Sequence, residues 1–368
     1  MEVKKVAVLG AGNGGMTAAA DLKGRGFEVA LYELPQFAKN LEVIQKKGGI
    51  LLQEPNEHPA REEFLEIDLV TTDIAEAVKD AQIIMLTIPG FAVDSFVEVL
   101  EPVVTEEQVI FFNGAASMGC VRFANKAKAL GINKKFKLCE VNSLSYGTRG
   151  FADEARVELT LRVNKLFFAA YPAEDTAELF DVCKQIYDCI VPAKNIWHTT
   201  LENGNPEVHP GPCLLNAGRI DYSNGEFWLY REGMTKHTVN VLHAIEHERM
   251  EIGKAFGFVL EDAVESRYRR GYFSNDKEDL QTLFNTSEVF TKIKGPSSCT
   301  ARYFVEDISD GLVLWSDLAK VAGVATPNID AVITLGSSLL QTDFRETGLT
   351  LKKLGLADLS IDQLIAKV

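Results

Sequence analysis

A glycine-rich stretch near the start of the chain has the spacing of a phosphate-binding turn. Gly10-Ala11-Gly12-Asn13-Gly14-Gly15 follows a strand-like apolar run at residues 6–9 and opens a helix expected at 16–23. In a G-x-G-x-x-G turn, Gly10 permits the tight bend, Gly12 lets the backbone approach a pyrophosphate, and Gly15 allows close helix-to-strand packing. The helix N-terminus adds N–H groups and a positive dipole. A purely structural turn can have the same pattern, so other residues must show whether this turn binds a dinucleotide.

A carboxylate at the end of the second expected strand supports a dinucleotide site. Glu33 follows residues 29–32, about 20 positions after the glycine loop, where it would accept hydrogen bonds from an adenosine ribose. It would also repel a 2′-phosphate and so favours NAD(H), while Lys39 and Lys46 downstream leave NADP(H) open. Loops after two later strands, at Pro89 and Asn113, would face the nicotinamide, although ordinary turns explain them equally well. The predicted cofactor-binding residues are Gly10, Gly12, Asn13, Gly14, Gly15, Glu33, Pro89 and Asn113.

His209 is the histidine that we single out for proton transfer. Imidazole changes protonation near neutrality, so it can give or take a proton during a reaction. A lone histidine is more often structural, and the interpretation depends on an acidic partner. Asp307 could hold one tautomer of the ring, and Arg302 could clamp a carboxylate in bidentate fashion. From these residues alone, an exposed Arg/Asp pair that caps a helix is the better explanation.

A second histidine motif points to zinc but is weaker. His243-x-x-Glu246-His247 matches the H-x-x-E-H pattern, which places two imidazoles one helical turn apart. No third ligand is evident in the sequence, and the glycine loop already indicates a different chemistry. We interpret the segment as the solvated face of a charged helix and predict no metal site.

Composition and charge argue against several classes of protein. The 368 residues include 38 Lys+Arg and 52 Asp+Glu, a net charge of −14, without a basic stripe for nucleic acid. Apolar runs fall far short of the roughly 20 residues that span a membrane, and no secretory leader is visible. The six cysteines form no C-x-x-C pair and are typical of reduced thiols. We expect a soluble cytoplasmic protein with small-molecule substrates and neither nucleic-acid nor membrane partners.

The alternation of elements predicts two domains. Up to about residue 170, short β-rich runs alternate with amphipathic stretches, a rhythm typical of βαβ units in a doubly wound parallel sheet. Residues 156–170 alternate in polarity and are expected to complete that sheet as a solvent-facing or antiparallel strand. Beyond about residue 199 helical periods dominate, as at 238–256 and 329–340. We therefore predict an α/β Rossmann-type domain at 1–192 and an all-α domain at 193–368.

Taken together, these segments resemble the opine dehydrogenase family, of the octopine/nopaline dehydrogenase type, over nearly the whole chain. The glycine loop carries the family's G-x-G-N-G-G form, and three later segments are far more discriminating. These segments are Asn203-x-Asn205-x-x-x-His209-Pro210, Arg302-Tyr303-x-x-Glu306-Asp307 with Gly311-Leu312-Val313, and Asp343-Phe344-Arg345 with Leu351-Lys352-Lys353-Leu354-Gly355-Leu356.

The resemblance implies a reaction and roles for individual residues. Family members use NAD(P)H to join the amino group of an α-amino acid to an α-keto acid and to reduce the resulting imine. By resemblance, His209 is the general acid/base, Asp307 orients it, and Arg302 clamps a carboxylate. Asn205 positions substrate or nicotinamide, while Glu140 and Arg149 belong to a segment on the substrate side.

Two departures from the family pattern leave the substrates open. The chain reads Asn113-Gly114-Ala115 where a proline is common, and Val141-Asn142 follows Glu140 in place of a small hydroxylated residue. A 2-hydroxyacid or polyol-phosphate dehydrogenase of similar plan, or a non-catalytic NAD(H) sensor, are the alternatives. The sequence also leaves the amino acid, the keto acid and a homodimer undecided.

Overall fold

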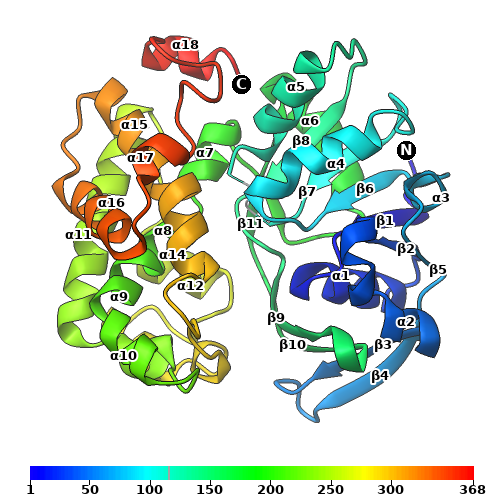
Figure 1. Cartoon of the computed structure of the whole chain (residues 1–368), viewed down its shortest axis with the longest axis horizontal. Helices are drawn as coiled ribbons and strands as arrows, with labels where there is room; N and C mark the ends of the chain where they lie inside the picture. The colour runs from blue at the N-terminus through cyan, green and yellow to red at the C-terminus, as the bar shows by residue number, and fades with distance from the viewer. Residues whose placement is uncertain (115–116) are drawn as a thin grey trace. The chain divides into compact units, whose positions relative to one another are not determined.

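The structure of the chain is a computed structural model that describes residues 1–114 and 117–368 (Figure 1). The described chain divides into two units, residues 1–199 and 200–368. Within these residues, every helix is too short or too polar to cross a bilayer.

The first unit contains an eight-stranded sheet in the order β12-β11-β8-β7-β6-β1-β2-β5. All neighbours are parallel except β8 and β11, which run antiparallel. The central strands are apolar and buried along their whole length, as expected where helices cover both faces. The strands are β1 (Lys5–Leu9), β2 (Glu28–Tyr32), β5 (Leu69–Thr71), β6 (Ile83–Leu86), β7 (Val109–Phe112), β8 (Lys137–Val141), β11 (Leu166–Tyr171) and β12 (Ile190–Pro192).

Helices accompany this sheet in the order that the βαβ rhythm predicts. Three of them, α3, α4 and α5, share one apolar core with alternate sheet residues such as Leu9, Ile84 and Phe112. The β1–α1 turn places the N-terminus of α1 at the carboxyl edge of the parallel strands. The helices of the unit are α1 (Asn13–Gly24), α2 (Glu42–Lys47), α3 (Ile74–Val78), α4 (Val93–Leu100), α5 (Gly119–Ala129) and α6 (Thr176–Cys183).

A second, four-stranded sheet was not predicted from the sequence. It has the order β4-β3-β10-β9 and is formed by β3 (Gly49–Glu54), β4 (Arg61–Glu66), β9 (Tyr146–Phe151) and β10 (Arg156–Arg162). The expected single strand at 156–170 is therefore divided. The alternating half, β10, is buried on one face only and joins the small sheet, whereas β11 is buried throughout and enters the large one.

The second unit is helical, and the described residues after β12 contain no strand. The Rossmann-type sheet followed by an all-α part confirms the predicted fold class. Two π-helical turns, η5 (Leu229–Gly233) and η7 (Asp307–Leu312), interrupt the helices. The α-helices are α7 (Ile196–Leu201), which crosses the boundary, α8 (Asn205–Val208), α9 (Pro210–Leu215), α10 (Ala217–Tyr222), α11 (Lys236–Ala255), α12 (Ala263–Arg269), α13 (Leu280–Thr286), α14 (Arg302–Glu306), α15 (Val313–Ala322), α16 (Pro327–Leu340), α17 (Phe344–Thr347) and α18 (Ile361–Ile365).

Substitutions at two glycines of the β1–α1 turn are predicted to lower stability by unequal amounts. A Cβ on Gly15 would lie 1.6 Å from the Gly10 carbonyl oxygen, whereas a Cβ on Gly12 meets nothing within 4 Å. Gly15→Ala must shift backbone and should lower the free energy of unfolding by about 3 kcal/mol or more. Gly12→Ala should cost less, about 1 kcal/mol, because alanine is a poorer N-cap residue than glycine but meets no steric clash here. Urea unfolding of both variants tests this, and equal losses would contradict it.

Candidate active site

The glycine loop forms an open turn at the start of α1. Gly10 has φ +96°, a left-handed conformation that favours glycine, and the Thr87 hydroxyl donates to the carbonyls of Leu9 and Gly10, both at 3.1 Å. Gly12 is the N-cap of α1, and no side chain caps this helix. Since the space beside Gly12 is empty, an anion can approach the N–H groups of the first turn.

Glu33 lies at the end of β2 and is buried against the same loop. One carboxylate oxygen accepts from the Ala11 N–H and the other from the Leu34 N–H, each at 2.9 Å. The side chain thus holds the loop in place. A carboxylate has about four acceptor positions, so capacity for a ribose hydroxyl remains. The uncapped helix, the space at Gly12 and this acceptor together fit a dinucleotide.

The other predicted cofactor residues differ in what they face. The Asn13 Oδ1 accepts from the Gly150 N–H at 3.0 Å, and Pro89 precedes a short helical turn at Gly90–Ala92. Asn113 is completely buried: its amide donates to the Tyr187 hydroxyl at 3.0 Å, and its Oδ1 accepts from Ser145. Asn113 therefore ties the end of β7 to the neighbouring segment. Ala115, next in that loop, lies outside the described residues.

Glu140 and Arg149, the expected substrate residues, lie on different sheets. Glu140 is buried near the end of β8, where the Thr199 hydroxyl donates to it at 2.8 Å, and burial raises the pKa of its carboxyl to about 7. Arg149 lies on β9, where its neighbours Thr148 and Gly150 contact α1. Because side chains alternate along a strand, Arg149 points away from α1, and it is exposed.

The helical unit brings His209 and Asp307 into contact. His209 follows α8, and Asp307 is the first residue of the π-helical turn η7. The His209 Nδ1 lies 2.8 Å from the Asp307 Oδ2, and the ring stacks on Tyr303 at 3.8 Å with planes 2° apart. His209 is only 7% exposed. A carboxylate on Nδ1 fixes the tautomer that carries its proton there and leaves Nε2 for proton transfer.

Tyr230 is a neighbour of His209 that the sequence analysis did not single out. Its hydroxyl lies 2.9 Å from the His209 Nε2, and its ring packs against Phe284 and Phe290. Burial raises the pKa of the phenol well above its ordinary value. No spacing rule links Tyr230 to His209; the only signal in the sequence was an aromatic run at 227–230.

Arg302 and Asn205 lie close in sequence to Asp307 and His209 respectively. Arg302 begins α14, whose continuation carries Asp307, and its side chain is 70% exposed while it pairs with Glu306 one turn away. Asn205 begins α8, and its backbone N–H donates to the Asn203 Oδ1 at 3.1 Å. Arg302 is thus accessible to an anionic ligand.

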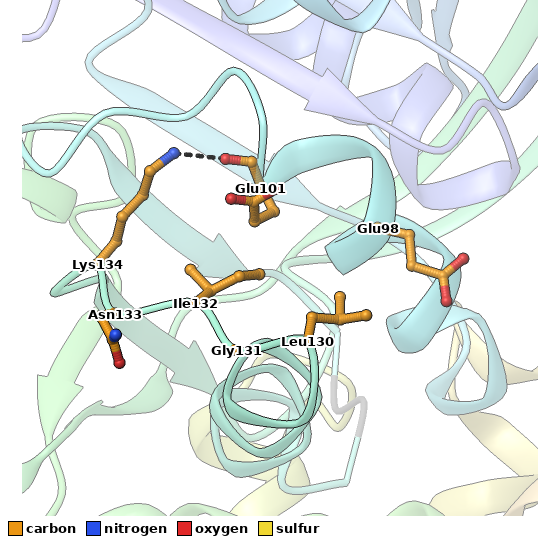
Figure 2. A pocket seen from close by; sticks show the side chains of 7 residues that line it. All are labelled: Glu98, Glu101, Leu130, Gly131, Ile132, Asn133 and Lys134. Carbon is orange, nitrogen blue, oxygen red and sulfur yellow. Dashed lines mark hydrogen bonds between the residues drawn. The ribbon is translucent and has the colours of Figure 1, made fainter.

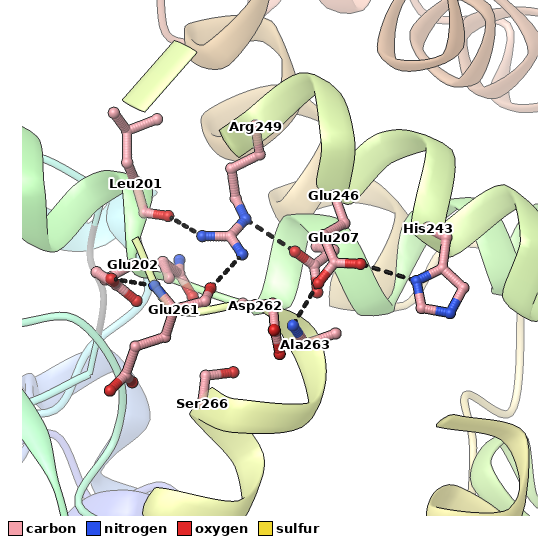
Figure 3. Close-up of polar contacts among 12 residues, drawn as sticks. Leu201, Glu202, Glu207, His243, Glu246, Arg249, Glu261, Asp262, Ala263 and Ser266 are labelled. Carbon is pink, nitrogen blue, oxygen red and sulfur yellow. Dashed lines mark hydrogen bonds and ion pairs between the residues drawn. The ribbon is translucent and has the colours of Figure 1, made fainter. Parts of the chain in front are cut away.

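A buried charge cluster holds the segment that leads to His209 (Figure 3). The Glu207 carboxylate, fully buried, accepts from the Arg249 Nε at 2.8 Å and pairs with the Arg267 Nη1 at 3.3 Å. Arg249 also donates to the carbonyls of Leu201 at 2.9 Å and Glu261 at 2.8 Å. The guanidinium of Arg249, on α11, therefore links the end of α7, α8 and the residue before the N-cap of α12.

The zinc-like motif has a structural role. The Glu246 carboxylate contacts the His243 Nδ1 at 2.8 Å and accepts from the Ala263 N–H at the start of α12 (Figure 3). Across residues 1–114 and 117–368, no three metal-ligating side chains gather.

A hollow of about 620 Å³ on the first unit lies between the ends of α4 and α5, with Lys134 donating to the Glu101 carbonyl at 2.5 Å (Figure 2). This hollow precedes β8, at the amino edge of the parallel strands, whereas the glycine loop follows β1 at the carboxyl edge. It is therefore distinct from the candidate cofactor site.

Comparisons with known proteins cover the whole chain. Residues 192–340 match the family described as NAD/NADP octopine/nopaline dehydrogenase, alpha-helical domain, and residues 5–115 match the NAD-dependent glycerol-3-phosphate dehydrogenase N-terminus. An opine dehydrogenase of Arthrobacter sp. (strain 1C) is 33% identical, with 98% of this chain and 97% of that protein covered. A vitopine synthase of Allorhizobium ampelinum is 25% identical, with 96% of each covered.

Solved structures share the fold. An octopine dehydrogenase with NADH and L-arginine matches with a TM-score of 0.72 at 20% identity, covering 98% of each chain. A yersinopine dehydrogenase with NADP+ matches with a TM-score of 0.65 at 15% identity, covering 99% of this chain and 97% of that one.

Glu140 predicts a pH-dependent loss of stability. Its folded pKa of about 7 exceeds the ordinary 4.5, so as pH rises from 4.5 to 7 the unfolded state releases the proton first and stability falls. The free energy of unfolding falls by at most about 3 kcal/mol, and it stays at this lower value above pH 7. Glu140→Gln should remove this dependence, because an amide has no proton to lose.

Urea midpoints at about pH 5 and about pH 8 measure the effect. The exposed Glu66→Gln on β4 is the matched control and should retain the wild-type dependence. A Glu140→Gln midpoint that falls with pH as steeply as the wild-type one would contradict the assignment.

Proposed function

Since this chain belongs to the opine dehydrogenase family, of the octopine/nopaline dehydrogenase type, we propose that it catalyses reductive condensation of an α-amino acid with an α-keto acid. The product is a secondary amine that carries two carboxylates. The observation that carries the proposal is the contact of His209 with Asp307, within the residues that match the family's helical domain. Such a pair suits the proton transfers that imine formation requires.

His209 moves protons in both halves of the condensation. As the neutral imidazole, it takes a proton from the substrate ammonium, so that the free amine attacks the keto carbonyl. The imidazolium then returns this proton to the carbinolamine hydroxyl, the C–O bond breaks and water leaves as the iminium forms. Asp307, at 2.8 Å from Nδ1, orients the ring and stabilises its charged form.

Arg302 and Asn205 orient the substrates in this proposal. The exposed Arg302 guanidinium provides a bidentate donor for a substrate carboxylate, in exchange for part of its contact with Glu306. Asn205 offers an amide at the start of α8, four residues before His209. When the amino acid and the keto acid are both bound near His209, they react within one complex and need not meet by diffusion.

The glycine loop and Glu33 hold the dinucleotide. The first-turn N–H groups of α1 would hold the pyrophosphate, and Glu33 would accept from the ribose. When bound, the nicotinamide supplies the hydride that reduces the iminium. Because Glu33 is an anion next to the ribose site, it disfavours a 2′-phosphate, and we propose a preference for NAD(H) over NADP(H).

The alternatives from the sequence have less support. The match to the glycerol-3-phosphate dehydrogenase N-terminus ends at residue 115, so it concerns the cofactor part of the chain and not the helical unit. A hydroxyacid dehydrogenase would consume NADH with a keto acid alone. A sensor would bind NADH without turnover and has no need of an acid/base pair.

The first test follows NADH oxidation with keto acids such as pyruvate, each with and without a panel of amino acids. We expect oxidation only when both substrates are present, and a secondary-amine dicarboxylate as product by mass spectrometry. With NADPH, kcat/KM should be at least about tenfold lower, because of Glu33. Oxidation with keto acid alone would replace this proposal with the hydroxyacid reaction.

Removal of the acid/base group should abolish turnover without loss of cofactor binding. His209→Gln and Asp307→Asn should each lower kcat by about 10²- to 10⁴-fold. The first variant lacks the group that transfers the proton, and in the second that group is no longer held in the correct orientation. The NADH dissociation constant, measured by fluorescence titration, should stay within about twofold of wild type, since the glycine loop is untouched. Glu251→Gln, on the surface of α11, is the control. Full activity of His209→Gln would exclude the acid/base role.

A further inference from the structure

Both ring nitrogens of His209 are engaged by protein groups. Nδ1 contacts Asp307 at 2.8 Å, and Nε2, the nitrogen that should exchange protons with substrate, contacts the Tyr230 hydroxyl at 2.9 Å. A substrate can therefore reach Nε2 only if Tyr230 moves away or if Tyr230 itself passes the proton.

Tyr230 is fixed too firmly to move away easily. Its ring is 3% exposed and packs on Phe290 at 4.3 Å and on Phe284 at 5.6 Å between centroids. The Asn285 amide donates to the Tyr230 backbone carbonyl at 2.8 Å, within the π-helical turn η5. His209 is equally confined by the stacked Tyr303 ring, and the Tyr303 hydroxyl is hydrogen-bonded to that of Tyr230.

We propose that Tyr230 is the terminal catalytic group of a relay, Asp307–His209–Tyr230, and that its hydroxyl exchanges the proton with the substrate. This inference rests on the proposed function and adds a residue to that site. A hydroxyl both donates and accepts, so it serves either protonation state of His209. Burial keeps the pKa of Tyr230 high, and the phenol therefore remains protonated between turnovers.

The relay balances in each direction. During loss of water, the Tyr230 O–H proton passes to the carbinolamine hydroxyl while the phenol oxygen takes the Nε2 proton of the imidazolium. The C–O bond breaks, water leaves, Tyr230 ends neutral and His209 becomes imidazole. During deprotonation of the substrate ammonium, the same transfers run in reverse, and Asp307 stabilises the imidazolium that results.

The test compares Tyr230→Phe with a matched control in the same aromatic cluster. Tyr230→Phe keeps the ring that packs on Phe290 and removes only the hydroxyl. Tyr272→Phe also removes a phenol hydroxyl from a ring stacked on Phe290, at 4.7 Å, but within the described residues it is the Tyr230 hydroxyl, not that of Tyr272, that contacts His209. We expect Tyr230→Phe to lower kcat at least about 10²-fold with KM and NADH affinity nearly unchanged, and Tyr272→Phe to stay within about twofold of wild type.

A double variant distinguishes a relay from a structural contribution. Members of one catalytic unit are non-additive, so Tyr230→Phe/His209→Gln should be no slower than the slower single variant. If Tyr230→Phe retains at least half of the wild-type kcat, or if the two losses multiply, the relay is wrong while the proposed function stands. If wild type shows no turnover with any substrate pair, both fail. Thermal unfolding of each variant confirms that the fold is kept.

Discussion

A charged group removed from water needs partners inside the protein, and this constraint organises both units of the chain. In the helical unit, Glu207 is fully buried between Arg249 and Arg267, and Glu248 accepts from the first N–H groups of α16. In the sheet unit, Glu33 is buried against the N–H groups of the glycine loop. The oxygens of Glu33 and Glu248 are satisfied by backbone N–H groups, and those of Glu207 by two guanidinium groups. A carboxylate without such partners would be protonated or would open the structure.

The same constraint explains how a reactive histidine is presented on a helical scaffold. The Arg249–Glu207 contact fixes α8, and His209 follows α8 immediately. Asp307 approaches from a π-helical turn, a feature often found at functional sites. The imidazole is thus held on three sides by a carboxylate, a phenol and a stacked ring. A ring so confined has lost most of its freedom before substrate arrives, which favours proton transfer along one direction.

Glu140 shows what happens where the constraint is met only in part. Its partners among the described residues are the Thr199 hydroxyl, the Cys120 thiol and, at 3.4 Å, the Cys120 backbone N–H, and none of these is a cation. Burial raises the pKa of Glu140 more than its hydrogen bonds lower it, and the pKa is therefore about 7. Glu33 is buried to a similar degree, but two close N–H groups meet its oxygens. The two carboxylates therefore differ in their partners: Glu33 accepts from two close backbone N–H groups, and Glu140 accepts mainly from one hydroxyl.

The sequence by itself determined the strand and helix rhythm, the glycine turn, the position of Glu33 and the family to which the chain belongs, because periodicity and short motifs are local properties of the chain. It did not predict the small sheet, since β10 pairs with β3, whose residues lie about a hundred positions earlier in the chain. Asn113 and Arg149 were predicted as site residues from short motifs. Only the packing of the chain determines that Asn113 is buried and that Arg149 is exposed. Tyr230 meets His209 across 21 residues, and Asp307 meets it across 98. Such contacts depend on how helices pack, which no local pattern encodes.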